Sequence, residues 1–196
     1  MEWTSQPSRL GQMVEEGIRY AVMEVSSHAL ELQRVACCDF DVAVFTNLTQ
    51  DHLDYHITME NYKAAKGMLF ERAAKSVINM DDAAGAYMKE KSVGEVLTIG
   101  VDEKADLMAE NIDISAEGTA FDMVWQGAKY PVKLATPGRF SVYNALTAIA
   151  ICRHFGVPKD AVVRALKQVK VKGRIEPVKV SDDFTLLIDY AHNAMA

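Results

Sequence analysis

The 196 residues are enough for one ordinary domain, and 49% apolar with 24% charged residues is typical of a globular protein with a hydrophobic core. A net charge of −6, without a run of Lys and Arg, argues against a nucleic-acid-binding surface. No apolar run approaches the ~20 residues of a membrane helix, and the first residues lack a signal-peptide pattern. We therefore expect a cytoplasmic protein that binds neither nucleic acid nor membrane. Its three cysteines are interpreted as small core residues.

The amino-terminal part predicts a helix followed by a buried strand. Residues 8–17 form a short amphipathic pattern with Leu10, Met13 and Val14 on its inner face. The apolar run at 20–25 is typical of a strand covered on both faces, as in a parallel α/β sheet. Glu24 interrupts this run near its carboxyl end, where open α/β sheets place their ligands.

The segment from residue 45 to residue 70 carries the densest polar chemistry. It follows a predicted helix at 29–35 and a predicted strand at 42–45. Carboxylates and rings come first, comprising Asp51, His52, Asp54, Tyr55 and His56. The next helix places five residues on one face at the 3-4 spacing of a buried stripe, namely Met59, Tyr62, Lys66, Leu69 and Ala73. Lys66 does not suit a core, because burying an ammonium group is costly unless it is paired, neutralised or chemically changed.

The rest of the chain continues to alternate strands and helices. Further strands are expected at 76–79, 95–99 and 184–188, and further helices at 81–91, 141–155 and 158–169. Alternating or β-branched stretches at 109–115, 119–125 and 129–134, separated by turn residues, predict three antiparallel strands. The pattern therefore predicts an α/β fold with a mainly parallel, doubly wound sheet flanked by helices, and a smaller antiparallel sheet beside it.

Polar side chains follow three of these predicted strands. Glu24, Asn47 and Asp189 each stand near the carboxyl end of a strand, so we expect them at one edge of the sheet. Asp81 and Asp82 are interpreted as the cap of the 81–91 helix.

The polar cluster supports several interpretations from the residues alone. Its carboxylates and imidazoles suit Mg²⁺, Mn²⁺ or Zn²⁺, and His52 with His56 could serve a metal hydrolase. A solvated loop with capping aspartates would contain the same residues. Lys66 could extend its charged end to solvent, or it could add CO₂ and become an anionic carbamate that binds Mg²⁺. Gly138-Arg139 and Gly173-Arg174 could grip a phosphate or could be helix-end pairs, and neither GxxxxGK[ST] nor GxGxxG occurs.

Five segments together resemble the Mur ligases of peptidoglycan synthesis. They read MEVSSHALELQRV, FTNLTQDHLDYHITMENYKAAKGMLF, TPGRFSVYNALTAIAI, KGRIEPV and DYAHNAMA, and they cover essentially the whole chain in order. The resemblance implies a ligase that uses ATP and Mg²⁺. It would activate the D-glutamate γ-carboxylate of UDP-N-acetylmuramoyl-L-alanyl-D-glutamate as an acyl phosphate and join it to a diamino acid, meso-diaminopimelate or L-lysine.

The resemblance also implies roles for particular residues. Glu24 and His52 match Mg²⁺ ligands, and Lys66 matches the lysine that is carbamylated and organises the second ion. Residues at the UDP-muramoyl-peptide would be Ser26, His28 and Arg34. Residues at the nucleotide would be Asn47, Asn144, Arg174, Asp189 and His192.

Within this family the chain is expected to be the central ATPase domain alone, over residues 1–196. We expect it to lack the phosphate-binding loop, the UDP-binding domain and the carboxyl-terminal domain, and to self-associate through the truncated sheet edge. Two alternatives remain at this point: a non-catalytic truncated domain, and a neighbouring amide ligase of the folylpolyglutamate, cyanophycin or D-glutamate-adding type.

Overall fold

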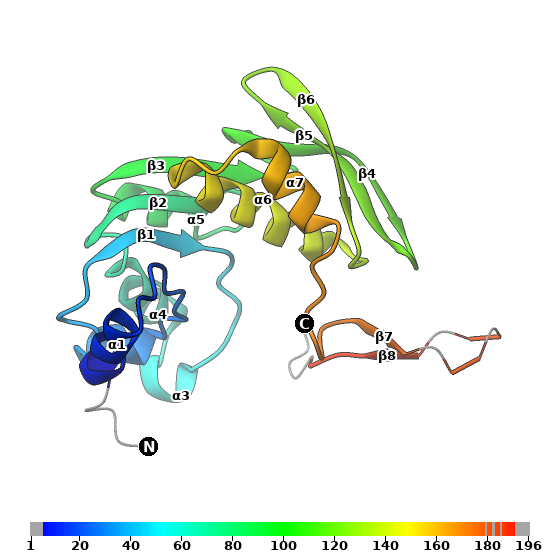
Figure 1. Cartoon of the computed structure of the whole chain (residues 1–196). Helices are drawn as coiled ribbons and strands as arrows, with labels where there is room; N and C mark the ends of the chain where they lie inside the picture. The colour runs from blue at the N-terminus through cyan, green and yellow to red at the C-terminus, as the bar shows by residue number, and fades with distance from the viewer. Residues whose placement is uncertain (1–5, 179, 182, 185, 191–196) are drawn as a thin grey trace.

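A computed structural model describes residues 6–178, 180–181, 183–184 and 186–190 (Figure 1). Its helices are α1 (Gln6–Glu15), α2 (Ser27–Glu31), α3 (Leu53–His56), α4 (Met59–Gly67), α5 (Gly85–Lys91), α6 (Arg139–His154) and α7 (Lys159–Leu166). Its strands are β1 (Phe40–Phe45), β2 (Ala73–Asn79), β3 (Glu95–Gly100), β4 (Leu107–Ser115), β5 (Gly118–Trp125), β6 (Ala128–Leu134), β7 (Glu176–Val178) and β8 (Leu186–Ile188). Among these helices, none is long and apolar enough to cross a membrane.

Six strands form one sheet in the order β1-β2-β3-β4-β5-β6. The first four are parallel neighbours and the last three are antiparallel, which confirms the mainly parallel α/β fold. The prediction that the antiparallel strands form a separate smaller sheet is wrong. β4 pairs with the end of β3 through Leu107 and Met108, so the antiparallel strands extend the main sheet.

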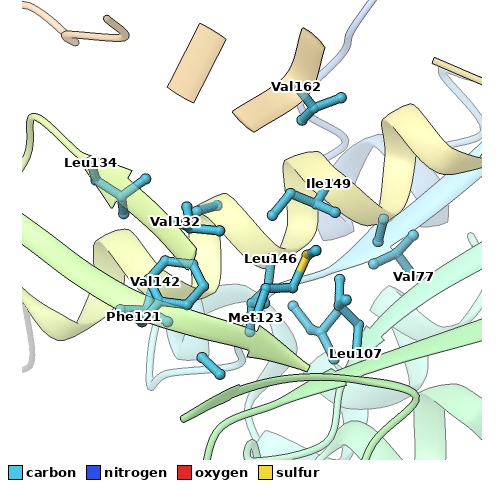
Figure 2. Close-up of a cluster of buried hydrophobic side chains, with 14 of the residues drawn as sticks. Val77, Leu107, Phe121, Met123, Val132, Leu134, Val142, Leu146, Ile149 and Val162 are labelled. Carbon is cyan, nitrogen blue, oxygen red and sulfur yellow. The ribbon is translucent and has the colours of Figure 1, made fainter. Parts of the chain in front are cut away.

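Alternating side chains of the parallel strands pack against helices on both faces of the sheet. Val77 of β2 joins the larger core, where Figure 2 shows Leu146 and Ile149 of α6 facing Leu107 and Met123 of the strands. Ile78, the next residue of β2, joins a second core with α5 on the opposite face. The period of two along a strand therefore explains why both neighbours are fully buried.

The amino-terminal segment differs from the sequence-based expectation. Residues 18–26 have no strand, and Tyr20 and Val22 are 66% and 102% exposed. Val14, assigned to the inner face of the first helix, is 73% exposed. An apolar run becomes a strand only where another strand pairs with it, and in the described part of the chain β1 pairs with β2 alone. Tyr20 lies instead against the ring of Phe155, which follows α6, with the ring centroids 5.4 Å apart.

The last predicted strand also has a different partner from the one expected. β8 pairs antiparallel with β7 in a two-stranded sheet that lies apart from the main sheet (Figure 1). The expectation that Glu24, Asn47 and Asp189 share one sheet edge is therefore wrong. Of the three, only Asn47 follows a strand of the six-stranded sheet.

Candidate functional site

Five aromatic rings from α2, α3, α4 and the loop before α3 gather beside the sheet. The ring of His28 lies 4.1 Å from that of Tyr55 and 5.0 Å from that of His52, centroid to centroid. The rings of His56 and Tyr62 are stacked at 5.2 Å. Offset and edge-to-face contacts of this kind stabilise a ring cluster beyond its buried area. The dense polar segment of the sequence is therefore an ordered cluster, not a solvated loop.

Local backbone chemistry determines where these helices begin. The Ser26 hydroxyl accepts a hydrogen bond from the amide of Ala29 at 3.2 Å, which caps α2. The Thr58 hydroxyl caps α4 in the same way through Asn61. His52 precedes α3 in the left-handed conformation, with φ 55° and ψ 24°.

His56 is the buried centre of the cluster, and its side chain connects α3 to α2. Its Nε2 is 2.7 Å from the Ser27 hydroxyl, and both residues are almost fully buried. Its Nδ1 lies 3.7 Å from the Glu31 carboxylate, which is too long for a hydrogen bond but close enough for electrostatic attraction. The sequence suggested a metal-binding role for His56, but the buried bond to Ser27 uses one of its ring nitrogens.

Lys66 of α4 points toward the segment that leads into α2. Its ammonium donates a hydrogen bond to the carbonyl oxygen of Val25 at 3.1 Å. Burial lowers the pKa of Lys66, while the nearby Glu24 carboxylate acts in the opposite direction. A half-buried amine beside a carboxylate is chemically unusual, and its lowered pKa increases the fraction of the amine that is neutral and nucleophilic.

Five of the residues predicted for the site therefore lie in one neighbourhood, namely Glu24, Ser26, His28, His52 and Lys66. Arg34 is half-buried in the turn after α2, and Asn47 is exposed in the loop after β1. Within the described ranges, no three His, Cys, Asp or Glu side chains form a group able to hold a metal. The predicted set of Glu24, His52 and Lys66 has only two such side chains besides the lysine, so its role as a metal site stays a prediction.

Two carboxylates at the carboxyl edge of the sheet have a role that the sequence analysis missed. Asp81 follows β2 and accepts hydrogen bonds from the amides of Val101, Asp102 and Glu103 and from the Tyr143 hydroxyl. Burial alone would raise the pKa of Asp81, but these bonds, that of Glu103 foremost, hold it below its usual range. The expected helix cap is wrong because α5 begins only at Gly85.

Asp82 connects the loop after β1 to the turn before α5. Its carboxylate accepts hydrogen bonds from the amides of Leu48 at 2.9 Å and Ala84 at 2.8 Å. An Asp-Asp pair directly after a strand was the available signal, since that position is where parallel sheets present polar groups.

The amino end of α6 lies near the loop stabilised by Asp81. Gly138 precedes the helix at φ 104°, a conformation that favours glycine. Arg139 forms an ion pair with Asp102, so the Gly138-Arg139 step contains a paired arginine at a helix start. Asn144, predicted near the adenine, is exposed on α6.

The remaining predicted nucleotide residues lie beside β7 and β8. The Arg174 guanidinium is 5.1 Å from the ring centroid of Tyr190. Asp189 accepts hydrogen bonds from the amides of Tyr190 at 2.9 Å and Ile175 at 3.3 Å. Figure 1 shows β7 and β8 on the other side of the molecule from α3 and α4. The structure therefore does not bring Arg174 and Asp189 to the ring cluster, and His192 lies outside the described residues.

Fold and site together define a helix-flanked α/β domain with a lysine-histidine cluster beside its parallel strands. A family model described as the Mur ligase middle domain matches residues 2–152, and the chain belongs to this family. The family membership agrees with the resemblance that the five sequence segments indicated.

Two similar proteins with an assigned name carry the same one. The chain is 52% identical over 181 residues to a UDP-N-acetylmuramoyl-L-alanyl-D-glutamate--2,6-diaminopimelate ligase of Caldanaerobacter subterraneus subsp. tengcongensis, covering 92% of this chain and 38% of that protein. It is 45% identical over 191 residues to the ligase of the same name from Bacillus velezensis, covering 92% of this chain and 39% of that protein. The chain thus spans well under half the length of these relatives.

Solved structures show the same fold. A structure of a UDP-N-acetylmuramoyl-L-alanyl-D-glutamate--2,6-diaminopimelate ligase superposes with a TM-score of 0.84 at 31% identity, covering 94% of this chain and 39% of that one. UDP-N-acetylmuramate-alanine ligase MurC from Thermotoga maritima superposes with a TM-score of 0.69 at 23% identity, covering 86% of this chain and 37% of that one, which is a likeness of fold alone.

Proposed function

We propose that this chain is the middle domain of an ATP-dependent ligase that adds a diamino acid to UDP-N-acetylmuramoyl-L-alanyl-D-glutamate during synthesis of the peptidoglycan precursor. The observation that carries the proposal is the half-buried contact of Lys66 with the Glu24–Val25 segment, which leads into the helix that carries His28. The 52% identity to a 2,6-diaminopimelate ligase supports this assignment and favours diaminopimelate over L-lysine as the amine.

The proposed reaction has two steps. The D-glutamate γ-carboxylate attacks the γ-phosphorus of ATP, which forms an acyl phosphate and releases ADP. The neutral amine of the diamino acid then attacks the acyl carbon through a tetrahedral intermediate, loses a proton and displaces inorganic phosphate. Positioning and charge compensation account for most catalysis in phosphoryl transfer.

The residues of the ring cluster suit the first step. Glu24 and His52 would bind Mg²⁺, which offsets negative charge on the transferred phosphoryl group when bound. The neutral amine of Lys66 would add CO₂ and release a proton, so that an oxygen-bearing carbamate replaces an ammonium group. Burial of Lys66 supports this role because it lowers the pKa and thereby provides the free amine.

Substrate contacts follow from the position of α2. Ser26, His28 and Arg34 would meet the UDP-muramoyl-dipeptide, because they lie in or next to this short helix. Asn47, Asn144, Arg174, Asp189 and His192 are proposed for the nucleotide. The positions of Arg174 and Asp189 imply that β7 and β8 would move toward the sheet edge in the working enzyme.

The test is release of phosphate from ATP by the intact ligase that contains this middle domain, with UDP-N-acetylmuramoyl-L-alanyl-D-glutamate as acceptor. We expect turnover with meso-diaminopimelate and at least about tenfold less with L-lysine, since a site built for a polar group discriminates against its absence. Activity only with a folate as the carboxylate substrate, or only with D-glutamate as the added amine, would contradict the proposal and indicate a neighbouring ligase class.

A further inference from the structure

A cavity lies between the strands β4, β5 and β6 and the end of α6 with the start of α7. It has a volume of about 340 Å³, within the size range of small-molecule pockets. Its floor consists of the core residues Leu107, Met123, Ile149 and Val162, contributed by β4, β5, α6 and α7. An adjoining cavity of about 460 Å³ shares Trp125 and Arg153 with it and reaches Lys75 and Glu95 near the amino ends of β2 and β3.

Two cations line this pocket, and aromatic rings hold both of them. The Arg153 guanidinium lies 4.1 Å from the centroid of the Trp125 ring, and the Lys159 ammonium lies 3.5 Å from that of Tyr130. In the described part of the chain neither cation forms an ion pair with a carboxylate, whereas the nearby Lys75 is 3.8 Å from Glu95. The pocket thus offers unneutralised positive charge on a protein of net charge −6.

The adjoining cavity adds a polar atom without a protein partner. Nε2 of His154, at the end of α6, is buried and has no hydrogen-bond partner among the described residues. A buried polar atom in this state is costly unless water or a ligand satisfies it. The two cavities together therefore combine an apolar floor, aromatic walls, the two ring-bound cations Arg153 and Lys159, the Lys75–Glu95 ion pair and a polar atom without a partner among the described residues.

We infer that this Trp125–Tyr130 pocket binds a small organic acid with an apolar or aromatic body. The body would displace water from the floor formed by Leu107 and Met123, and the carboxylate would meet Arg153 and Lys159 at the mouth. Ring-stacked cations are suited to this role because their orientation is already fixed before the ligand arrives. The site lies between the strands β4, β5 and β6 and the end of α6 with the start of α7, and none of its lining residues belongs to the proposed reaction centre.

The test uses the full 196-residue chain with Trp3→Phe, so that Trp125 is the remaining tryptophan and reports binding by its fluorescence. The probe is 3-phenylpropionate, with 3-phenylpropan-1-ol as its neutral counterpart. For a ligand of about eleven non-hydrogen atoms we expect a Kd of about 1 mM for the acid and about tenfold weaker binding of the alcohol. Arg153→Gln and Lys159→Gln should each weaken the acid about tenfold and leave the alcohol unchanged.

Two further variants test whether the probes bind in this pocket and not elsewhere on the chain. Val157→Phe, at a partly exposed position of the pocket lining, should fill the mouth and weaken both probes. Arg164→Gln removes an exposed cation from α7 outside the lining and should change neither affinity. Equal affinity for acid and alcohol, or acid binding that is insensitive to Lys159→Gln and Val157→Phe, would overturn the inference. Arg153, Val157 and Lys159 are all exposed, so none of these variants removes a core side chain.

Discussion

At the residue scale, two side chains account for the unusual chemistry of the ring cluster. Lys66 interrupts an apolar stripe and donates a hydrogen bond to the carbonyl of Val25. His56 is buried, and its ring nitrogen shares a hydrogen bond with the Ser27 hydroxyl. The first arrangement leaves a reactive amine near a carboxylate, and the second fixes the helix from which His28 projects. Lys66 is therefore the candidate for the chemistry of the site, whereas His56 stabilises the structure around it.

Replacing Lys66 tests its proposed carbamate role. In the intact ligase we expect Lys66→Ala to reduce turnover at least about a hundredfold, because the phosphoryl group loses part of its charge compensation. Added short-chain carboxylate should restore part of the rate, since it can occupy the place of the carbamate. Lys63→Ala, on the same helix, is the matched control. Full activity of Lys66→Ala without carboxylate would show that the lysine only covers apolar surface.

Replacing His56 tests its structural role. We expect His56→Ala to lower the free energy of unfolding by about 2–4 kcal/mol, because it leaves a cavity and an unpaired Ser27 hydroxyl. His52→Ala, whose side chain is 40% exposed, should cost less than about 1 kcal/mol. Urea denaturation measures both values. Equal losses for the two variants would contradict the assignment of His56 as the buried centre.

At the element scale, Asp81 joins three elements that are distant in sequence. It follows β2, binds the turn after β3 and accepts a hydrogen bond from Tyr143 of α6. At the carboxyl edge of the sheet, Asp81 thus connects β2, the turn after β3 and α6.

The hydrogen bonds of Asp81 predict that the folded chain becomes less stable in acid. The pKa of Asp81 is lower in the folded chain than in the unfolded chain, so its stabilisation is present above the unfolded value of about 3.9 and is lost as pH falls through the folded value. We expect Asp81→Asn to cost about 1–3 kcal/mol at pH 7 and less in acid. Thermal unfolding from pH 7 to pH 3 measures the difference. Asp106→Asn, which removes the carboxylate bonded to Thr98, serves as a comparison, and a cost of Asp81→Asn that is independent of pH would contradict the prediction.

At the scale of the whole molecule, the six-stranded sheet has an edge at β1. β1 has one paired neighbour in the described part of the chain, and Tyr20 and Val22, in the segment before α2, expose their side chains to solvent. Unpaired strand edges with exposed hydrophobic groups promote association. We therefore expect the 196-residue chain to form dimers or larger species in sedimentation experiments. Tyr20→Lys with Val22→Lys should shift it toward monomer, whereas Lys substitutions at Val169 and Val171 should not; a monomer at all concentrations would contradict this prediction.

Nucleotide affinity is the second property of the whole molecule. We expect the 196-residue chain to bind ATP with a Kd weaker than about 100 µM, because its sequence contains no glycine-rich loop to surround the phosphates with backbone amides. Calorimetry with Mg²⁺-ATP measures this affinity, with the intact ligase as the positive control. Micromolar binding of ATP by the 196-residue chain would contradict this prediction. It would show that Asn144, Arg174 and Asp189 suffice for ATP binding without a glycine-rich loop.

The sequence by itself determined the type and order of most elements and the composition of the ring cluster. Periodicities of two and of three to four residues report which faces are buried, so β5, β6 and α6 were predicted nearly at their observed bounds. The predicted helical stripe containing Lys66 is too long, because α4 ends at Gly67 and Ala73 begins β2. Only the tertiary structure decided which strands pair, because pairing depends on partners distant in the chain. It left residues 20–25 without a strand, joined β8 to β7, and turned Asp81 from an expected helix cap into the acceptor that connects β2, β3 and α6.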